Sequence, residues 1–309
     1  MFEIFLKTLP FFGLIGLGYG AAKTRFFAEE AAGHITRFVF YFALSAMLLR
    51  FSANLTFSEI FDPHLAAAYL WGTAFTYGIA LGVAFFRHLD TATSAIEAQC
   101  AAIGNTGFLG VPMLAVLLGQ EAVGPIILIL SIDLIVFSTL LTILVTGTRG
   151  NDRGMRVVRT VFLGLLKNPM IVSIALGLSL SASAVPLPEV VNSFLATLGA
   201  AATPGALFAI GMSLASKSAE RIEVAAWLSF AKLILHPAFV AAGAYLFFPV
   251  DAYKASVAVS AAALPVAGNV YILAQHYGVA PQRVSASILV STAASILTVS
   301  VVIGLVAVN

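Results

Sequence analysis

Ten long apolar runs make up most of the chain and limit the folds that it can adopt. They cover residues 3–22, 31–50, 65–86, 91–118, 122–147, 157–181, 190–214, 224–248, 253–276 and 284–307. A helix needs roughly 20 mostly apolar residues to cross the hydrocarbon core of a lipid bilayer. Charged residues are 10% of the 309 residues, whereas soluble domains contain about 25%. The sequence therefore predicts an all-α, multi-pass membrane protein of ten transmembrane helices without a soluble domain.

The charges and the single cysteine exclude several other classes of protein. The net charge of +2 is too small to indicate nucleic-acid binding. Cys100 is the only cysteine, so the chain cannot form an internal disulfide. A cleaved signal peptide carries its positive charge before its apolar core. Here Glu3 and Lys7 nearly cancel, and Lys23 and Arg25 follow the core, so we expect the first helix to be retained.

The distribution of basic residues predicts an orientation, because cytoplasmic loops are enriched in Lys and Arg. If the N-terminus lies outside, twelve basic residues fall in inside loops: Lys23, Arg25, Arg37, Arg87, Arg149, Arg153, Arg156, Arg159, Lys167, Lys217, Arg221 and Arg283. Only Lys7, Arg50 and Lys254 fall outside, and Lys232 lies in the middle of a run. This bias predicts a protein of the cell membrane, inner or plasma, with both termini outside.

A polar segment, residues 148–156, divides the chain into halves of five runs each, residues 1–147 and 157–309. We expect this segment to be a cytoplasmic linker. Because five is an odd number, two similarly folded halves would have opposite orientations in the membrane. Such inverted repeats are typical of secondary transporters. The sequence thus predicts a first and a second five-helix repeat.

The fourth and ninth runs are interrupted near their middles by residues that do not suit a continuous helix. The interruptions read Gly104-Asn105-Thr106-Gly107-Phe108-Leu109-Gly110-Val111-Pro112 and Leu264-Pro265-Val266-Ala267-Gly268-Asn269-Val270-Tyr271. At about 1.5 Å per residue, both breaks reach the middle of a core of about 30 Å, so the two helices can cross. Broken helices at matching positions of two halves point to a transport site. The alternative is a kink or a close helix contact, because Gly and Pro are common in membrane helices.

The two breaks supply the candidate substrate-binding residues. Asn105 and Asn269 either contact the solute or cap the broken helix ends, since each amide offers donors and an acceptor. The half-helix that begins near Phe108 presents free N–H groups and a positive dipole end, where an anion can bind. Pro112 suits the first turn of that half-helix. The full set is Ser45, Asn105, Thr106, Gly107, Phe108, Pro112, Pro265, Asn269 and Tyr271.

Four ionisable residues inside the runs form a second set, because an ionisable group within a membrane is unfavourable and calls for a role. Asp133 and Lys232 form either a structural buried pair or a site that carries a proton or senses charge. His236 lies one turn from Lys232 on the same face and is either packed or titrating. Glu97 either binds a cation or lines the inner vestibule. We expect neither a metal nor a cofactor, apart from a coupling proton or sodium ion.

The motif from Gly104 to Pro112 resembles the fourth helix of the auxin efflux carrier family, whose bacterial members include malonate and malate permeases. Further similarities are Lys167-Asn168-Pro169, Thr203-Pro204-Gly205-Ala206-Leu207-Phe208-Ala209-Ile210-Gly211 and Pro265-Val266-Ala267-Gly268-Asn269. The resemblance implies a scaffold of helices 1, 2, 6 and 7, a transport domain of helices 3–5 and 8–10, an elevator movement and a homodimer. The chain departs from the family at Ser45, where a proline is expected, and it lacks the long cytosolic loop of the plant carriers.

These observations favour a secondary active transporter of small organic anions. A dicarboxylate such as malonate or malate, or an auxin-like carboxylate, is the expected substrate, and alternating access is expected to be of the elevator type. The alternative is a cation/proton antiporter or a sodium-coupled symporter of the related crossed-helix fold. A membrane enzyme is not expected, because Glu97 and Asp133 lie on different helices and no HExxH motif occurs. The residues leave the direction of transport and the coupling ion open.

Overall fold

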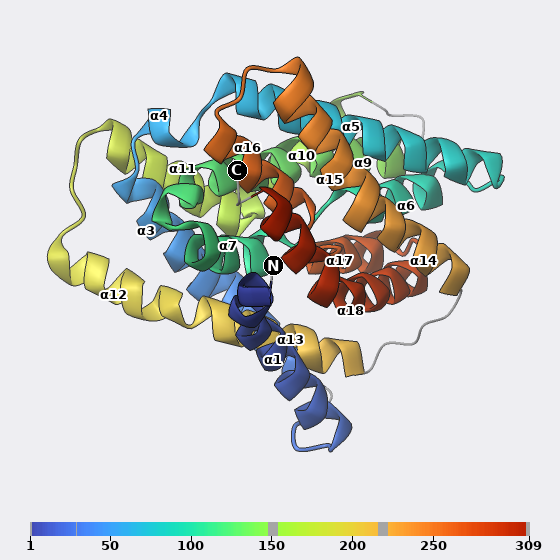
Figure 1. Ribbon diagram of the computed structural model, residues 1–309, viewed down its shortest axis with the longest axis horizontal. Helices are drawn as coiled ribbons and strands as arrows, with labels where there is room; N and C mark the ends of the chain where they lie inside the picture. Colours follow the sequence, from blue (N-terminus) through green and yellow to red (C-terminus); the bar gives the residue numbers. More distant parts are fainter. Residues whose placement is uncertain (1, 29, 148–153, 216–221, 307–309) are drawn as a thin grey trace.

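The computed structural model describes residues 2–28, 30–147, 154–215 and 222–306 (Figure 1). Regular structure in these ranges is helical, and the one β feature is an isolated antiparallel bridge between Gly104 and Val266. The protein is therefore all-α, as predicted. Most of the expected linker and the basic residues Arg149, Arg153, Lys217 and Arg221 lie outside the described residues.

The helices of the two halves follow the predicted runs closely. The first half contains α1 (Phe2–Lys23), α2 (Ala31–Phe38), η1 (Val39–Ala43), α3 (Leu44–Asn54), α4 (Phe57–Ile60), α5 (Pro63–Phe86), α6 (Thr91–Ala102), η2 (Thr106–Gly110), α7 (Val111–Leu118), η3 (Gln120–Ala122), α8 (Val123–Ile132), η4 (Asp133–Phe137) and α9 (Ser138–Thr146). The second half contains α10 (Gly154–Lys167), α11 (Pro169–Ala182), α12 (Glu189–Ala200), α13 (Ala202–Ala215), α14 (Ile222–Phe230), η5 (Ala231–Leu235), α15 (His236–Ala242), η6 (Gly243–Phe247), α16 (Ala252–Ala262), α17 (Gly268–Tyr277) and α18 (Pro281–Val306).

Seven continuous helical segments of the described chain are long and apolar enough to cross a membrane. They are Glu3–Lys23, Ala31–Asn54, Phe57–Phe86, Gln120–Thr146, Glu189–Ala215, Ile222–Phe247 and Pro281–Val306. The chain is thus a helical membrane protein. The segments α6–α7 and α16–α17 do not pass as single spans because each is interrupted, which agrees with the two breaks that the sequence predicts.

The expected single span 157–181 differs in the structure, where it consists of two helices that meet at a 72° bend. The bend lies at Asn168, whose Oδ1 accepts a 3.0 Å hydrogen bond from the backbone N–H of Met170 and caps α11. Pro169 follows at the first helical position, where its missing N–H is not needed. The local sequence therefore ends one helix and begins another, although the hydropathy of the run is continuous.

Close packing of α1 on α13 requires glycine on both helices (Figure 1). A Cβ atom on Gly211 would lie 1.9 Å from the carbonyl oxygen of Ile15, and one on Gly18 would lie 2.1 Å from that of Phe208. Gly177 likewise brings α11 against α3 near Leu49. These contacts join α1, α3, α11 and α13, which belong to the helices expected to form the scaffold.

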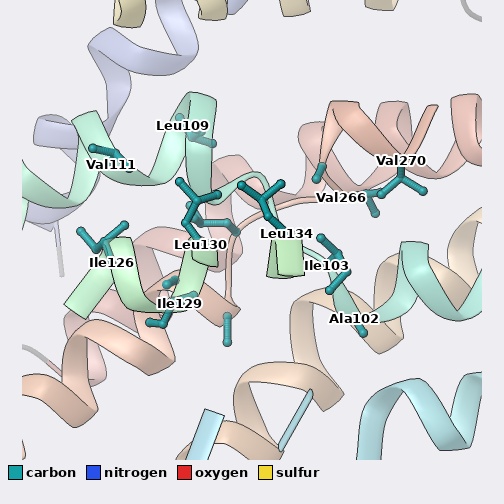
Figure 2. Packing of buried hydrophobic residues seen from close by; sticks show 14 of the residues in the cluster. Ala102, Ile103, Leu109, Val111, Ile126, Ile129, Leu130, Leu134, Val266 and Val270 are labelled. Atoms are coloured by element: carbon teal, nitrogen blue, oxygen red, sulfur yellow. The ribbon is translucent and has the colours of Figure 1, made fainter. Parts of the chain in front are cut away.

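Apolar side chains fill the space around the two breaks. Figure 2 shows Ile103 and Val266, one from each break, beside Leu134 of η4, and all three are buried. On the far side of this core, Gly72 of α5 allows close contact with Val240 of α15. Several of the packed segments contain π-helical turns, and two of these turns carry the buried residues Asp133 and Lys232. Such turns occur frequently at functional sites.

Candidate functional site

The two breaks cross each other and are joined by backbone hydrogen bonds. The N–H of Asn105 donates to the carbonyl oxygen of Pro265 at 2.8 Å, and the N–H of Ala267 donates to that of Ile103 at 3.1 Å. These bonds satisfy backbone groups that lipid cannot satisfy, which is a requirement for irregular backbone at membrane depth. The crossing brings together the ends of four half-helices, α6, η2–α7, α16 and α17.

Neither asparagine caps a broken helix. Asn105 is the N-cap of η2, but its side chain makes no capping hydrogen bond. Asn269 is the second residue of α17, and its Oδ1 is enclosed without a hydrogen-bond partner among the described residues. The capping role that the sequence left open is therefore not observed. Of the two, Asn269 lines the cavity described below, whereas Asn105 is buried at the crossing.

Lys232 lies against the crossing and forms a buried chain of polar contacts. Its Nζ donates to the carbonyl oxygen of Ala262, the last residue of α16, at 2.5 Å and lies 3.0 Å from Nδ1 of His236. Nε2 of His236 lies 3.0 Å from the hydroxyl of Thr73. Lys232 and His236 are both fully buried. The ammonium group thus lies at a helix C-terminus, where the dipole is negative and favours a cation.

Asp133 is the first residue of the π-helical turn η4, inside the continuous segment α8–η4–α9. Its Oδ1 accepts a 2.9 Å hydrogen bond from the hydroxyl of Tyr69. Its Oδ2 is enclosed without a hydrogen-bond partner among the described residues, and so is the hydroxyl of Thr106, the first residue of η2. Within the described chain Asp133 forms no salt bridge with Lys232, so the expected direct pair is not found, although the two charges interact through space. Lys232 instead bonds the end of α16, and Asp133 bonds Tyr69 of α5.

The contacts of Glu97 point to a structural role instead of the cation-binding or vestibule role that the sequence left open. Its carboxylate is 1% exposed and bonds two guanidinium groups, that of Arg87 at 2.8 Å and that of Arg283. Arg87 lies at the end of α5, Glu97 in α6 and Arg283 at the start of α18. Two arginines already neutralise this carboxylate, and Glu97 is not among the residues of the cavity beside the crossing. We therefore interpret it as a link between three helices.

A cavity of about 650 Å³ lies beside the crossing. It is bounded by α2 and η1, by η4 and α9, by α10, by α13 and by α17. Phe108, Asn269 and Tyr271 of the expected site line it. The remaining expected substrate residues do not: Ser45, Asn105, Thr106, Gly107, Pro112 and Pro265. The Ser45 hydroxyl donates a 2.9 Å hydrogen bond to the carbonyl oxygen of Phe40. This bond within the same helical segment satisfies the hydroxyl donor.

Pro112 is the second residue of α7 and lies in the first turn of that α-helix, where its missing N–H is not needed. The half-helix itself begins earlier than expected, as a π-helical turn at Thr106. Pro112 is therefore separated from the break by η2. Pro265, in contrast, lies within the break itself and accepts the hydrogen bond from Asn105.

The cavity contains polar residues that sequence reasoning missed. Arg37 of α2 and His276 of α17 are exposed in its wall, and Thr142 bonds the hydroxyl of Tyr277 at 3.0 Å. Asn168, which bends the sixth run, also lines it. No Asp or Glu is present among the described lining residues. In the sequence Arg37 indicates only the orientation of the chain, because a single sequence does not reveal which segments face the same cavity.

Crossed broken helices beside a cavity, in a helical membrane protein, are the architecture of a membrane transporter. Comparison with known proteins agrees. The family model described as "Membrane transport protein" matches residues 3–303. The chain therefore belongs to this family, the auxin efflux carriers that its motifs resemble, and it is a transporter rather than an enzyme. It is 30% identical over 306 residues to a Rhizobium meliloti (strain 1021) protein described as "Putative malonate transporter", covering 97% of this chain and 95% of that protein.

Proposed function

We propose that the protein is a secondary active transporter of small organic anions, with a dicarboxylate such as malonate as its first candidate substrate. The observation that carries this proposal is the charge of the cavity beside the crossing. Its described lining contains Arg37 and no carboxylate. A cavity of this kind favours an anion over a cation. The description of the Rhizobium meliloti relative supports malonate as the candidate.

The substrate carboxylate is proposed to bind at the start of α17. Gly268 and Asn269 line the cavity there, and the N-cap residue Ala267 provides no side-chain cap. The first N–H groups of a helix are free, and its positive dipole end favours negative charge. The Asn269 amide and the Phe108 ring complete this end of the cavity. A carboxylate would therefore find hydrogen-bond donors without a buried lysine.

The movement is proposed to be of the elevator type, with ten spans in two inverted repeats. The cavity lies between α2, α10 and α13 on one side and α9 and α17 on the other. These groups correspond to the scaffold and to the transport domain of the family. With both termini outside, Arg37 and α10 face the cytoplasm, so this conformation is open to the inside. A homodimer joined through its scaffolds is part of the same proposal.

Two features weigh against the alternative of a cation/proton antiporter or sodium-coupled symporter. Glu97 is neutralised by two arginines, and Asp133 does not line the cavity. In a cell with a negative interior, each anionic charge gains about 2.3 kcal/mol per 100 mV on leaving. Uncoupled movement therefore favours export, and uptake of a dianion requires at least two co-transported cations.

The test is a flux assay in proteoliposomes that contain the purified protein. Radiolabelled malonate and acetate are followed with and without gradients of sodium ions and protons. We expect malonate flux that empty liposomes lack and that Asn269→Ala reduces. Sodium or proton exchange without any carboxylate movement would instead support the antiporter. A carboxylate flux that requires sodium would support the symporter.

A further inference from the structure

We propose that Arg37 selects dianions by binding the carboxylate group that does not contact the crossing. This inference rests on the proposed transport of organic anions and deepens it. It concerns a residue of α2, a helix that carries no other expected substrate contact.

The position of Arg37 follows from a ring contact on the same helical segment. Phe40 of η1 lies 6.3 Å from the ring of Phe108, measured between centroids, and both residues line the cavity. Arg37 precedes Phe40 by three residues, so it shares this face of the segment about 4.5 Å further along the axis. Thr36 and Tyr41 line the same wall. Arg37 is therefore roughly one helical turn from the crossing, within the cavity wall.

No carboxylate of the described part of the chain engages Arg37. Among the described residues it forms neither a salt bridge nor a side-chain hydrogen bond, and no Asp or Glu lines the cavity around it. Other arginines are engaged. Arg87 and Arg283 bond Glu97, and Arg50 donates to Oδ1 of Asn192 at 3.0 Å. Within the described ranges, the donors of Arg37 are thus free for a ligand that enters the cavity.

A planar guanidinium group matches a carboxylate through two parallel N–H···O bonds. A monocarboxylate needs only the donors at the start of α17, whereas a dicarboxylate has a second group for Arg37. Arg37 should therefore discriminate between them. It lies on a proposed scaffold helix, and Asn269 lies on a proposed moving helix. The elevator movement would separate the two sites, so Arg37 should act only on substrate that enters from the side facing Arg37.

The experiment compares Arg37→Gln with the matched control Arg25→Gln. Arg25 is an exposed arginine at the end of α1, on the same predicted side, and it does not line the cavity. Malonate and acetate uptake are measured in proteoliposomes, from each side separately. We expect Arg37→Gln to raise the KM for malonate about tenfold or more from the Arg37 side, the factor that corresponds to one charge-assisted hydrogen bond. In Arg37→Gln, the KM for acetate and the KM for malonate added from the opposite side should change by less than about twofold. The KM values of Arg25→Gln should also change by less than about twofold.

An unchanged malonate-to-acetate ratio in Arg37→Gln, with the protein folded, overturns the inference. If Arg37→Gln does not fold, Arg37→Lys provides the same test, because it keeps the charge but loses the fork geometry. It should raise the KM for malonate by a smaller factor than Arg37→Gln, and a malonate-to-acetate ratio equal to wild type overturns the inference here as well. Failure of wild type to move either anion is a different result, since it refutes the proposed function itself.

Discussion

The ammonium group of Lys232 donates a hydrogen bond to the carbonyl oxygen of Ala262, the last residue of α16. A Cβ atom on Gly104, in the opposite break, would lie 3.2 Å from the same ammonium group. Lys232 therefore touches both interrupted segments. Its charge is used to hold the crossing together, and it is not exposed to the cavity.

Replacing Lys232 with Met should lower the stability of the protein by about 3 kcal/mol, in the range for buried charges that lose a partner. The change leaves the Ala262 carbonyl without its donor and Asp133 without a compensating charge. Asp133→Asn should restore part of the loss. Thermal unfolding in detergent measures the double-mutant cycle, and malonate affinity is read separately. Affinity loss that Asp133→Asn does not repair would show that Lys232 contacts the substrate. The exposed variant Lys7→Gln, which removes only the i,i+4 pair with Glu3, is the control and is expected to cost less than about 1 kcal/mol.

Asn269→Ala should weaken malonate binding more than Asn105→Ala does. Only Asn269 lines the cavity, although both side chains lie at the crossing and neither caps a helix. Loss of a hydrogen bond to a charged group corresponds to about 1.5–3 kcal/mol, or roughly 10- to 150-fold in affinity. Isothermal titration of the purified variants checks this order. Equal and normal affinities in both variants would contradict the placement of substrate at the start of α17.

Pro265→Ala should reduce transport, whereas Pro112→Ala should have a smaller effect. Position 265 lies in the break, and an N–H there would allow α16 to extend toward the carbonyl oxygen of Ala261. Pro112 already lies within helical structure. Initial rates of malonate uptake, normalised to the amount of folded protein, measure both variants. Wild-type rates in Pro265→Ala would refute a role for this proline in keeping the break open.

Glu97→Gln should destabilise the protein without changing the ion dependence of transport. The substitution removes the carboxylate that binds two arginines and leaves their positive charges close together. A lower unfolding temperature is expected, and simultaneous Arg87→Gln should recover part of it by relieving repulsion. Transport is then measured over a series of sodium concentrations. A changed sodium dependence in Glu97→Gln would instead indicate that this residue binds a cation.

The helical content and the two breaks were predictable because they depend on local chemistry. Apolar runs of the right length have few alternatives to helices in a bilayer, and clustered Gly and Pro interrupt them. Hydropathy alone does not predict the bend at Asn168. Hydropathy measures composition and is insensitive to the direction of a helix, whereas the capping signal Asn168-Pro169 was visible in the sequence.

The residues that line the cavity were less predictable from the sequence than the crossing of the two broken helices. Phe108, Asn269 and Tyr271 line it as expected, but Arg37, Asn168 and His276 come from helices far apart in sequence. Their meeting depends on tertiary packing. The expected Asp133–Lys232 pair shows the same limit. Both residues were correctly identified as buried inside helices, yet the groups that they touch, Tyr69 and Ala262, lie on other segments.

The bridge between Gly104 and Val266 fixes the alignment of two distant stretches of chain, 103–105 and 263–267. Inserting or deleting one residue in either stretch would rotate the following half-helix by about 100° about its axis. Such a rotation would turn Phe108 or Asn269 away from the cavity, whatever residue was inserted. Chain length in these two stretches is therefore constrained more tightly than residue identity. In the evolution of such a protein, substitutions can accumulate there while gaps are eliminated.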